Sequence, residues 1–237
     1  MEQDPFSENS TPQDEHWIPL SDLMTGLMMI FMLIALSYMI KVESVNARIR
    51  TIAVQYNQLH VDLYQDLTKE FTPDLKEWGA EIHKDLSISF KEPDILFDTG
   101  SDTIKPRFRE ILTNFFPRYV KILSSPKYRD SIREIRVEGH TSSFWKGAVS
   151  TDDAYFRNMA LSQARTRTTL EYVLTLPQVL NEKNWLKKLL TANGLSSSHL
   201  VFDNGGREDF SQSQRVEFRV RTNAEAKIAN IIEAAKE

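Results

Sequence analysis

Apolar residues dominate one stretch near the N-terminus, from Leu20 to Ile40, and a single acid, Asp22, interrupts it. The uncharged run from Leu23 to Ile40 would span about 27 Å as a helix, close to the thickness of the hydrocarbon core of a bilayer. The pattern therefore predicts a membrane-spanning helix over residues 20–41. An ionisable group costs about 2.5–3.5 kcal/mol at the bilayer centre and less near an end, which favours an ion-binding role for Asp22. The alternative is a first-turn acid that favours the positive end of the helix dipole and has no function.

After this segment, apolar positions recur at alternating spacings of three and four, which is the seam of a left-handed coiled coil. The seam residues are Val42, Val45, Ile49, Ile52, Tyr56, Leu59 and Leu63. They predict a helical coiled-coil linker over residues 42–73 and a parallel homodimer. A single helix lying on a neighbouring protein would show the same stripe. Asp66 breaks the register, and Pro73 is expected to end the helix.

From residue 74 the pattern changes to alternating strands and helices. Residues 86–90 and 135–138 alternate apolar with polar positions, which predicts two strands with one wet face each. The apolar stripe of a helix lies between them: Phe108, Ile111, Leu112, Phe115, Phe116, Tyr119, Val120 and Leu123. Further helices are predicted over residues 155–176 and 183–192, the second ending at Asn193-Gly194, with a last strand over residues 216–220. The predicted class is α/β, a two-layer α/β sandwich over residues 74–237.

Composition and charge narrow the class of protein. The chain has 237 residues, 29 Lys and Arg, 33 Asp and Glu, and no Cys. Residues 1–40 hold six of the acids and no Lys or Arg, so they lack the basic region of a cleaved signal peptide, and the helix is expected to be retained. Residues 1–19 then form a short tail. The rest of the chain is nearly neutral, which excludes the basic footprint of a nucleic-acid-binding protein.

Candidate chemistry is sparse. The five histidines lack metal-ligand spacing, and the glycines form neither a P-loop nor a nucleophile elbow, so we expect no enzyme, no metal and no cofactor. Asn158, Leu161 and Arg165 share one face of a predicted helix, where the planar guanidinium of Arg165 can bind a carboxylate. This pattern predicts an anion pocket. Taken singly, Arg165 also fits a surface ion pair, and His140 fits a structural histidine.

Four segments occur in the order found in OmpA-like peptidoglycan-binding domains, and the domain resembles that family. They are FDTGSDTIKP at residues 97–106, IRVEGHT at 135–141, NMALSQAR at 158–165 and QRVEF at 214–218. The resemblance implies that Thr141, Ser142, Asn158, Leu161 and Arg165 bind peptidoglycan.

The membrane segment HWIPLSDLMTGLMMIFML, with Trp17, Asp22 and Thr25, is similar to the helix of MotB and PomB, the B subunits of flagellar stators. This resemblance implies that Asp22, with Thr25 beside it, binds and releases a transported H⁺ or Na⁺. It also implies a homodimer of B subunits inside a pentamer of MotA-like subunits in the bacterial inner membrane.

Two departures from the family concern the predicted pocket. Ser142 stands where the family usually has an aspartate after Gly-His-Thr, and the stretch from His140 to Asn158 is longer than in outer-membrane relatives. With the linker and the acidic tail, these features are more similar to the B subunit of the Zorya anti-phage system than to a flagellar subunit. The pentameric partner would then be the Zorya A subunit. Asp152 or Asp153 in the longer loop is a candidate for the missing carboxylate.

Charge bias opposes the topology that the resemblance implies. Lys41, Arg48 and Arg50 follow the membrane helix and no basic residue precedes it, which favours a cytoplasmic C-terminus. The family has the reverse orientation, with a cytoplasmic tail and a periplasmic domain. We follow the resemblance, because a wall-binding domain has no ligand in the cytoplasm.

Other functions fit parts of the same pattern. The chain could be a flagellar stator subunit, or a passive membrane-to-peptidoglycan tether without ion flow in which Asp22 only pairs with a partner helix. It could also be an energy-transducing partner resembling ExbD or TolR, which carry a membrane aspartate; the OmpA-like motifs count against this reading.

Overall fold

The computed structural model describes residues 17–91, 93–223 and 233, which belong to two compact units. One unit contains the chain up to Thr51, and the other begins at Ile52. Both units share the helix α1 (Trp17–Trp78). Residues 1–16 of the predicted tail lie outside the described residues.

The helix α1 is longer than predicted, because it continues through Pro73. A proline inside a helix removes one hydrogen bond and costs about 3 kcal/mol. Arg118 supports the helix beside this point. Its guanidinium donates to the Glu70 side chain at 2.7 Å, to the Glu70 carbonyl at 2.8 Å and to the Asp74 side chain at 2.8 Å. The expectation that Pro73 ends the helix is therefore wrong, since tertiary contacts hold the helix on both sides of the proline.

The last part of the predicted coiled-coil seam lies in the core of the second unit. Leu63 is fully buried there, and the partly buried Leu59 packs against the same core. Leu63 is thus used within one chain and is not free for a dimer seam. The side chains of Ile52 and Tyr56 lie outside the described residues. The packed core therefore begins within the predicted linker, ahead of the predicted domain boundary at residue 74.

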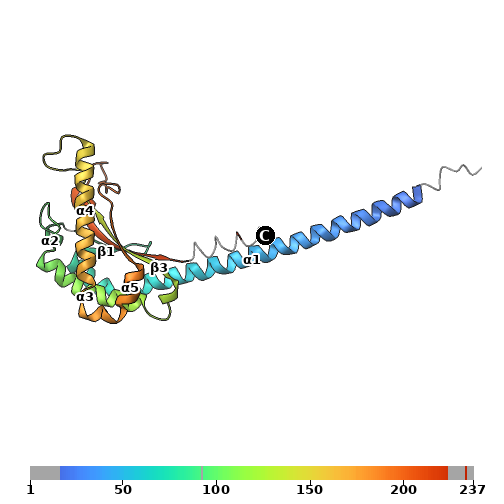
Figure 1. Ribbon diagram of the computed structural model, residues 1–237, viewed down its shortest axis with the longest axis horizontal. Helices are drawn as coiled ribbons and strands as arrows, with labels where there is room; N and C mark the ends of the chain where they lie inside the picture. Colours follow the sequence, from blue (N-terminus) through green and yellow to red (C-terminus); the bar gives the residue numbers. More distant parts are fainter. Residues whose placement is uncertain (1–16, 92, 224–232, 234–237) are drawn as a thin grey trace, which may run out of the picture. The chain divides into compact units, whose positions relative to one another are not determined.

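A five-stranded sheet forms the centre of the second unit (Figure 1). Its strands are β1 (Ala80–Ile82), β2 (Ser87–Phe90), β3 (Ile132–His140), β4 (Leu190–Gly194) and β5 (Arg215–Thr222). Their order is β1-β2-β5-β3-β4, with β3 and β4 parallel and the other neighbours antiparallel. The last strand therefore lies between the two strands that the sequence predicted first.

The helical layer packs on one face of this sheet. It contains α3 (Pro106–Leu123), α4 (Thr151–Val173) and α5 (Lys183–Leu189), and the short helices α2 (Pro93–Leu96), α6 (Phe210–Ser213), η1 (Arg129–Ser131) and η2 (Pro177–Glu182) complete the unit. All eight residues of the predicted apolar stripe on α3 are buried, which confirms that prediction. The ring of Phe115 lies 5.0 Å from that of Phe90 and 5.1 Å from those of Phe71 and Phe218. Phe115 lies on α3 and thus packs this helix against α1, β2 and β5. The predicted α/β class is confirmed.

Two sequence-based expectations about the sheet need correction. Asn193-Gly194 ends the strand β4 and not a helix, because α5 stops at Leu189 and the chain then pairs in parallel with β3. The outer face of the sheet is also less wet than predicted. Ser89 and Glu138 are buried there, and Arg219 pairs with Glu138, whereas Arg136 stays half-exposed as expected.

Candidate functional site

Two glycines let α4 approach the sheet closely. A Cβ atom added at Gly139 would lie 2.6 Å from Thr166 Cγ2 and 2.9 Å from the Ser162 carbonyl oxygen. One added at Gly194 would lie 2.7 Å from Gln163 Cα. These distances are too short for any side chain. Glycine at the ends of β3 and β4 therefore lets the middle of α4 lie directly against the sheet, beside the loop that follows β3.

A cavity of about 460 Å³ lies at this junction. It is lined by Phe97, Thr99, Gly100, Thr141, Ser142, Phe144, Trp145, Lys146, Asn158, Leu161, Arg165 and Gln214. The structure thus brings together the five residues predicted to bind peptidoglycan, from the loop after β3 and from one face of α4. Their binding role remains a prediction.

Arg165 binds the neighbouring loop of residues 98–101 in addition to lining the cavity. Its Nε donates to the Ser101 carbonyl at 2.9 Å, its Nη2 donates to the Asp98 carbonyl at 3.1 Å, and its guanidinium lies 4.9 Å from the centre of the Phe97 ring. Burial lowers the pKa of Arg165 to about 10, and the nearby Asp102 opposes this shift. The group stays charged at neutral pH. It holds the loop of residues 98–101 and leaves Nη1 outside both hydrogen bonds.

Asn158 fixes the loop on the other side. Its side-chain amide donates to the Ser142 carbonyl at 3.0 Å and to the Phe144 carbonyl at 3.3 Å. Asn158, Thr141 and Ser142 are all buried, and the Thr141 hydroxyl has no hydrogen-bond partner within the described residues. Leu161 adds an apolar wall. Asn158 therefore positions the loop in addition to lining the cavity.

Neither candidate for the missing carboxylate lines the cavity. Asp153 belongs to the N-terminal cap of α4: its carboxylate accepts from the Val149 N–H at 3.1 Å and from Arg157 Nε at 2.7 Å, while its own N–H donates to Ser150 Oγ. Asp152 lies exposed in the same turn. Acidic side chains are favourable in the first turn of a helix, because they interact with the positive end of the helix dipole. The suggestion that Asp152 or Asp153 completes the pocket is wrong, because neither lines the cavity and Asp153 caps the start of α4.

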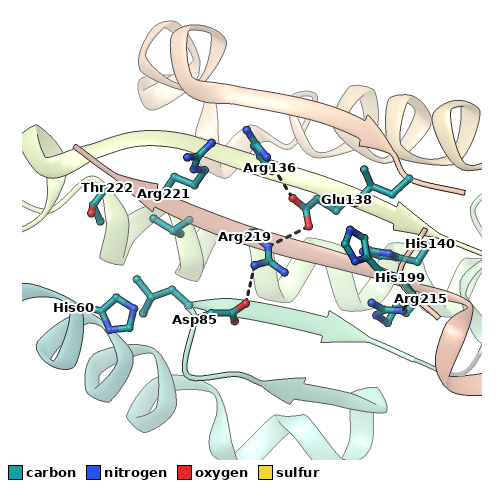
Figure 2. Close-up of a pocket in the computed structure, with 13 residues that line it drawn as sticks. His60, Asp85, Arg136, Glu138, His140, His199, Arg215, Arg219, Arg221 and Thr222 are labelled. Carbon is teal, nitrogen blue, oxygen red and sulfur yellow. Dashed lines mark hydrogen bonds and ion pairs between the residues drawn. The ribbon is translucent and has the colours of Figure 1, made fainter. Parts of the chain in front are cut away.

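A second, charged cavity of about 530 Å³ lies on the outer face of the sheet (Figure 2). Arg219 lies at its centre. Its Nε donates to Glu138 at 3.1 Å, its Nη1 to Asp85 at 2.6 Å and its Nη2 to Glu217 at 3.1 Å. One side chain of β5 thus joins β3 to the chain just before β2. This network ties the strands together on the face of the sheet opposite α3 and α4.

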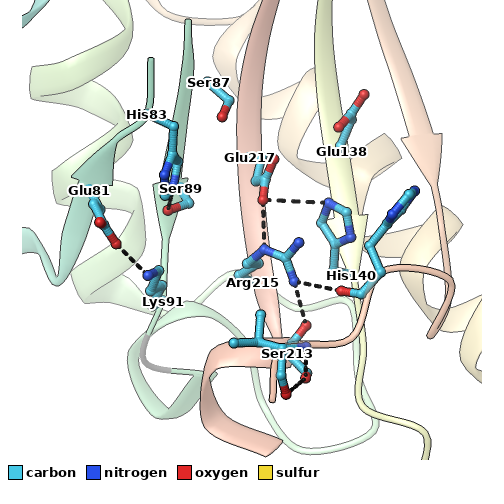
Figure 3. Close-up of polar contacts among 12 residues, drawn as sticks. Glu81, His83, Ser87, Ser89, Lys91, Glu138, His140, Ser213, Arg215 and Glu217 are labelled. Carbon is cyan, nitrogen blue, oxygen red and sulfur yellow. Dashed lines mark hydrogen bonds and ion pairs between the residues drawn. The ribbon is translucent and has the colours of Figure 1, made fainter. Parts of the chain in front are cut away.

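His140 ends β3 in the same network (Figure 3). Its Nε2 lies 3.8 Å from Glu217 Oε1, and neither ring nitrogen has a hydrogen-bond partner within the described residues. Glu217 Oε1 accepts a hydrogen bond from Arg215 Nε at 2.6 Å. Burial lowers the pKa of His140 to about 3, and the positive charge of Arg215 adds to this effect. The imidazole is therefore neutral at pH 7, which agrees with a structural histidine.

Glu138, His140 and Glu217 place ligand atoms within 4.8 Å of one another, a spacing that a metal ion could use. Guanidinium groups already bind both carboxylates, however. The positive charge of Arg215, which adds to the effect of burial on the pKa of His140, would also oppose a divalent cation. The cluster fits an ion-pair network better than a metal site.

The membrane candidate lies in the first unit. Within the described residues, one segment, Leu20–Thr51, is long and apolar enough to cross a membrane. Asp22 and Thr25 both lie in it, one helical turn apart. The Thr25 hydroxyl donates to the Ser21 carbonyl at 2.7 Å, a common bond inside helices. The ion-carrying role of the two residues remains a prediction.

Comparison with a curated relative identifies the family, although no family model matches the chain. The Zorya protein ZorB from Escherichia coli is 47% identical over 221 residues, which cover 93% of this chain and 93% of that protein. The chain belongs to the ZorB family. The resemblance to a Zorya B subunit is thereby confirmed.

Solved structures also resemble this ZorB-family chain. A putative MotB-like protein from Desulfovibrio vulgaris aligns with 70% of this chain and 95% of that chain, at 20% identity and a TM-score of 0.47. The periplasmic domain of Helicobacter pylori MotB aligns with 62% of this chain and 84% of that chain, at 16% identity and a TM-score of 0.44.

Three residues around the ZorB-family cavity did not stand out in the sequence. Lys146 and Trp145 line it from the longer loop, and Glu208 accepts hydrogen bonds from the Ser143 N–H at 2.9 Å and from the Ser143 hydroxyl. The contact between Glu208 and Ser143 spans 65 residues of sequence. No local pattern indicates it. The length of the loop was the one signal that pointed to this region.

Proposed function

We propose that this ZorB-family chain is the B subunit of a stator-type membrane motor that acts in anti-phage defence. One observation carries the proposal: a single chain combines a membrane-length helix containing Asp22 with a cavity formed by the five residues predicted to bind peptidoglycan. A protein with both features can transmit force between an ion-driven partner and the cell wall.

The proposed assembly has two copies of this chain inside a pentamer of Zorya A subunits in the bacterial inner membrane. Residues 20–41 cross the membrane once, the N-terminal tail lies in the cytoplasm, and the cavity lies in the periplasm. The basic residues after the helix oppose this orientation. Its support is the cavity itself, which can reach peptidoglycan only from the periplasm.

In the proposed mechanism Asp22 alternates between a charged form and a protonated or sodium-bound form. The charged form is costly within the hydrocarbon core and is favoured where water reaches the helix. Occupancy of the carboxylate is thus coupled to its exposure, and each exchange moves the partner ring one step. The cavity holds the B subunits to the wall, so the pentamer turns around them.

The substitution Asp22→Asn tests the ion-carrying role. It keeps the size and the hydrogen-bonding capacity of the side chain and removes its titration. We expect the variant to co-purify with the A subunit and to lose both phage protection and ion flux in proteoliposomes. Glu43→Gln is a matched control, because Glu43 is an exposed acid of the same helix beyond the apolar run, and it should keep both activities.

Full protection by an assembled Asp22→Asn complex would refute ion carriage and favour a passive tether. Native protein that is not retained by purified sacculi would refute the wall anchor. The two parts of the proposal therefore fail separately.

A further inference from the structure

The charges that line the cavity of about 460 Å³ have one sign. Arg165 and Lys146 are its two charged lining residues, and no carboxylate belongs to the lining within the described part of the chain. The acids around it are engaged elsewhere. Asp153 caps α4, and Glu208 accepts hydrogen bonds from Ser143. Asp102, whose charge acts on Arg165 from outside the lining, accepts a hydrogen bond from Thr168 at 3.1 Å. The cavity is therefore a cationic site.

The loop that carries Lys146 is held in place from several sides. Asn158 binds the carbonyls of Ser142 and Phe144, and the Ala148 N–H donates to the Trp145 carbonyl at 3.2 Å. Lys146 is exposed and forms no ion pair with the described residues. Because the backbone of the loop is already fixed, binding an anion has to order only the Lys146 side chain.

The aromatic residues of the lining can pack against the apolar part of a ligand. Phe97, Phe144 and Trp145 line the same cavity, and Phe144 is 65% exposed. Aromatic walls in a cavity with two cations favour a ligand that has an apolar body and carboxylates at its ends. A free ammonium group on that ligand would face Lys146 and Arg165 without an acidic partner, and like charges at this range repel.

We propose that the cavity binds an acidic peptide through two carboxylates, with Lys146 as a second cationic anchor beside Arg165, and that it discriminates against a ligand with a free side-chain amine. This inference rests on the proposed wall anchoring. In peptidoglycan, a cross-link acylates the side-chain amine of the acceptor stem peptide and leaves that of the donor unchanged. The cavity therefore selects the acceptor stem peptides of cross-links over uncross-linked stem peptides.

Two soluble muropeptides that differ only in this amine, free in one and N-acetylated in the other, provide the test. Their affinities for the full-length protein in detergent micelles are measured by calorimetry. The native protein should bind the N-acetylated muropeptide at least about fivefold more tightly, because removal of one like charge near two cations is worth about that factor. Lys146→Glu should abolish or reverse the preference, since it supplies an acidic partner for the amine.

Lys187→Glu is the matched control. Lys187 is exposed on α5 and does not line the cavity, so the same change in net charge should leave the preference unaltered. Retention by purified sacculi is measured in parallel, and thermal unfolding checks that each variant is folded.

The proposal is overturned if the native protein binds the free-amine muropeptide as tightly as the acetylated one. It is equally overturned if folded Lys146→Glu keeps the native preference, or if sacculi retain the protein while neither muropeptide binds. In each of these cases retention by sacculi leaves the proposed wall anchor standing. Loss of retention by native protein would refute that anchor instead.

Discussion

Replacing Arg165 with alanine should weaken both the domain and its binding to the wall. The side chain bridges α4 to the loop of residues 98–101 through two hydrogen bonds to carbonyl oxygens, and it lies over the Phe97 ring. Alanine removes all three contacts and leaves two carbonyl groups to find water. The same change removes the cation that we expect to meet a carboxylate of the ligand.

The loss of stability can be bounded from these contacts. A hydrogen bond to a charged group contributes about 1.5–3 kcal/mol, and a partly exposed cation–π contact about 0.5–1 kcal/mol. The three contacts share one guanidinium and do not add fully. The desolvation that lowers the pKa of Arg165 offsets part of the gain. We therefore expect Arg165→Ala to lower the free energy of unfolding by about 2–3 kcal/mol.

Thermal unfolding of the full-length protein measures this loss of stability. A loss of this size should lower Tm by about 4–12 °C, given about 2–4 °C per kcal/mol for domains of this length. Binding to purified sacculi measures the anchor, and its affinity should fall about 10–100-fold with the charge-assisted contact. Arg165→Lys is the matched variant. Lysine keeps the charge without the planar guanidinium, so this variant should lose most of the stabilising hydrogen bonds to residues 98 and 101 and retain part of the binding to sacculi.

Two results would refute this reasoning. An Arg165→Ala protein with the native Tm would show that the bonds to residues 98 and 101 do not stabilise the domain. Native retention of folded Arg165→Ala by sacculi would remove Arg165 from the binding site, even with Tm lowered as expected.

Three further predictions concern the sheet, the linker and pH. Gly194→Ala should cost about 1–3 kcal/mol in the free energy of unfolding, because its Cβ would force the backbone of α4 at Gln163 away; an unchanged urea midpoint would contradict this. Ile49→Asp should weaken self-association of the full-length protein by placing a charge in the predicted dimer seam, and an unaltered mass by light scattering would exclude the parallel dimer. The pKa of His140 is depressed to about 3, so native stability should decline as pH falls from 6.5 toward 3, and His140→Gln should flatten that decline in urea unfolding.

Elements with a strong local pattern could be predicted from the sequence. The stripe on α3 places every apolar side chain on one face by helical periodicity alone, and all eight are buried as expected. The strand β5 alternates in the same simple way, with Val216 and Phe218 in the core and Glu217 on the outer face. The face shared by Asn158, Leu161 and Arg165 also follows from helix geometry. In each case the spacing along one element decides the result.

The tertiary structure alone decided how these elements are used. Pro73 lies inside α1 because Arg118, far along the chain, supports the helix beside it. Leu63 fits a dimer seam by its spacing but lies in the core of its own domain.

The site shows the same dependence on distant contacts. Asp153 is held in a helix cap instead of the cavity, and Gly139 matters only because α4 passes within contact distance of β3. A local pattern states which side chains share a face. The free energy of packing, which depends on partners distant in sequence, determines what that face contacts.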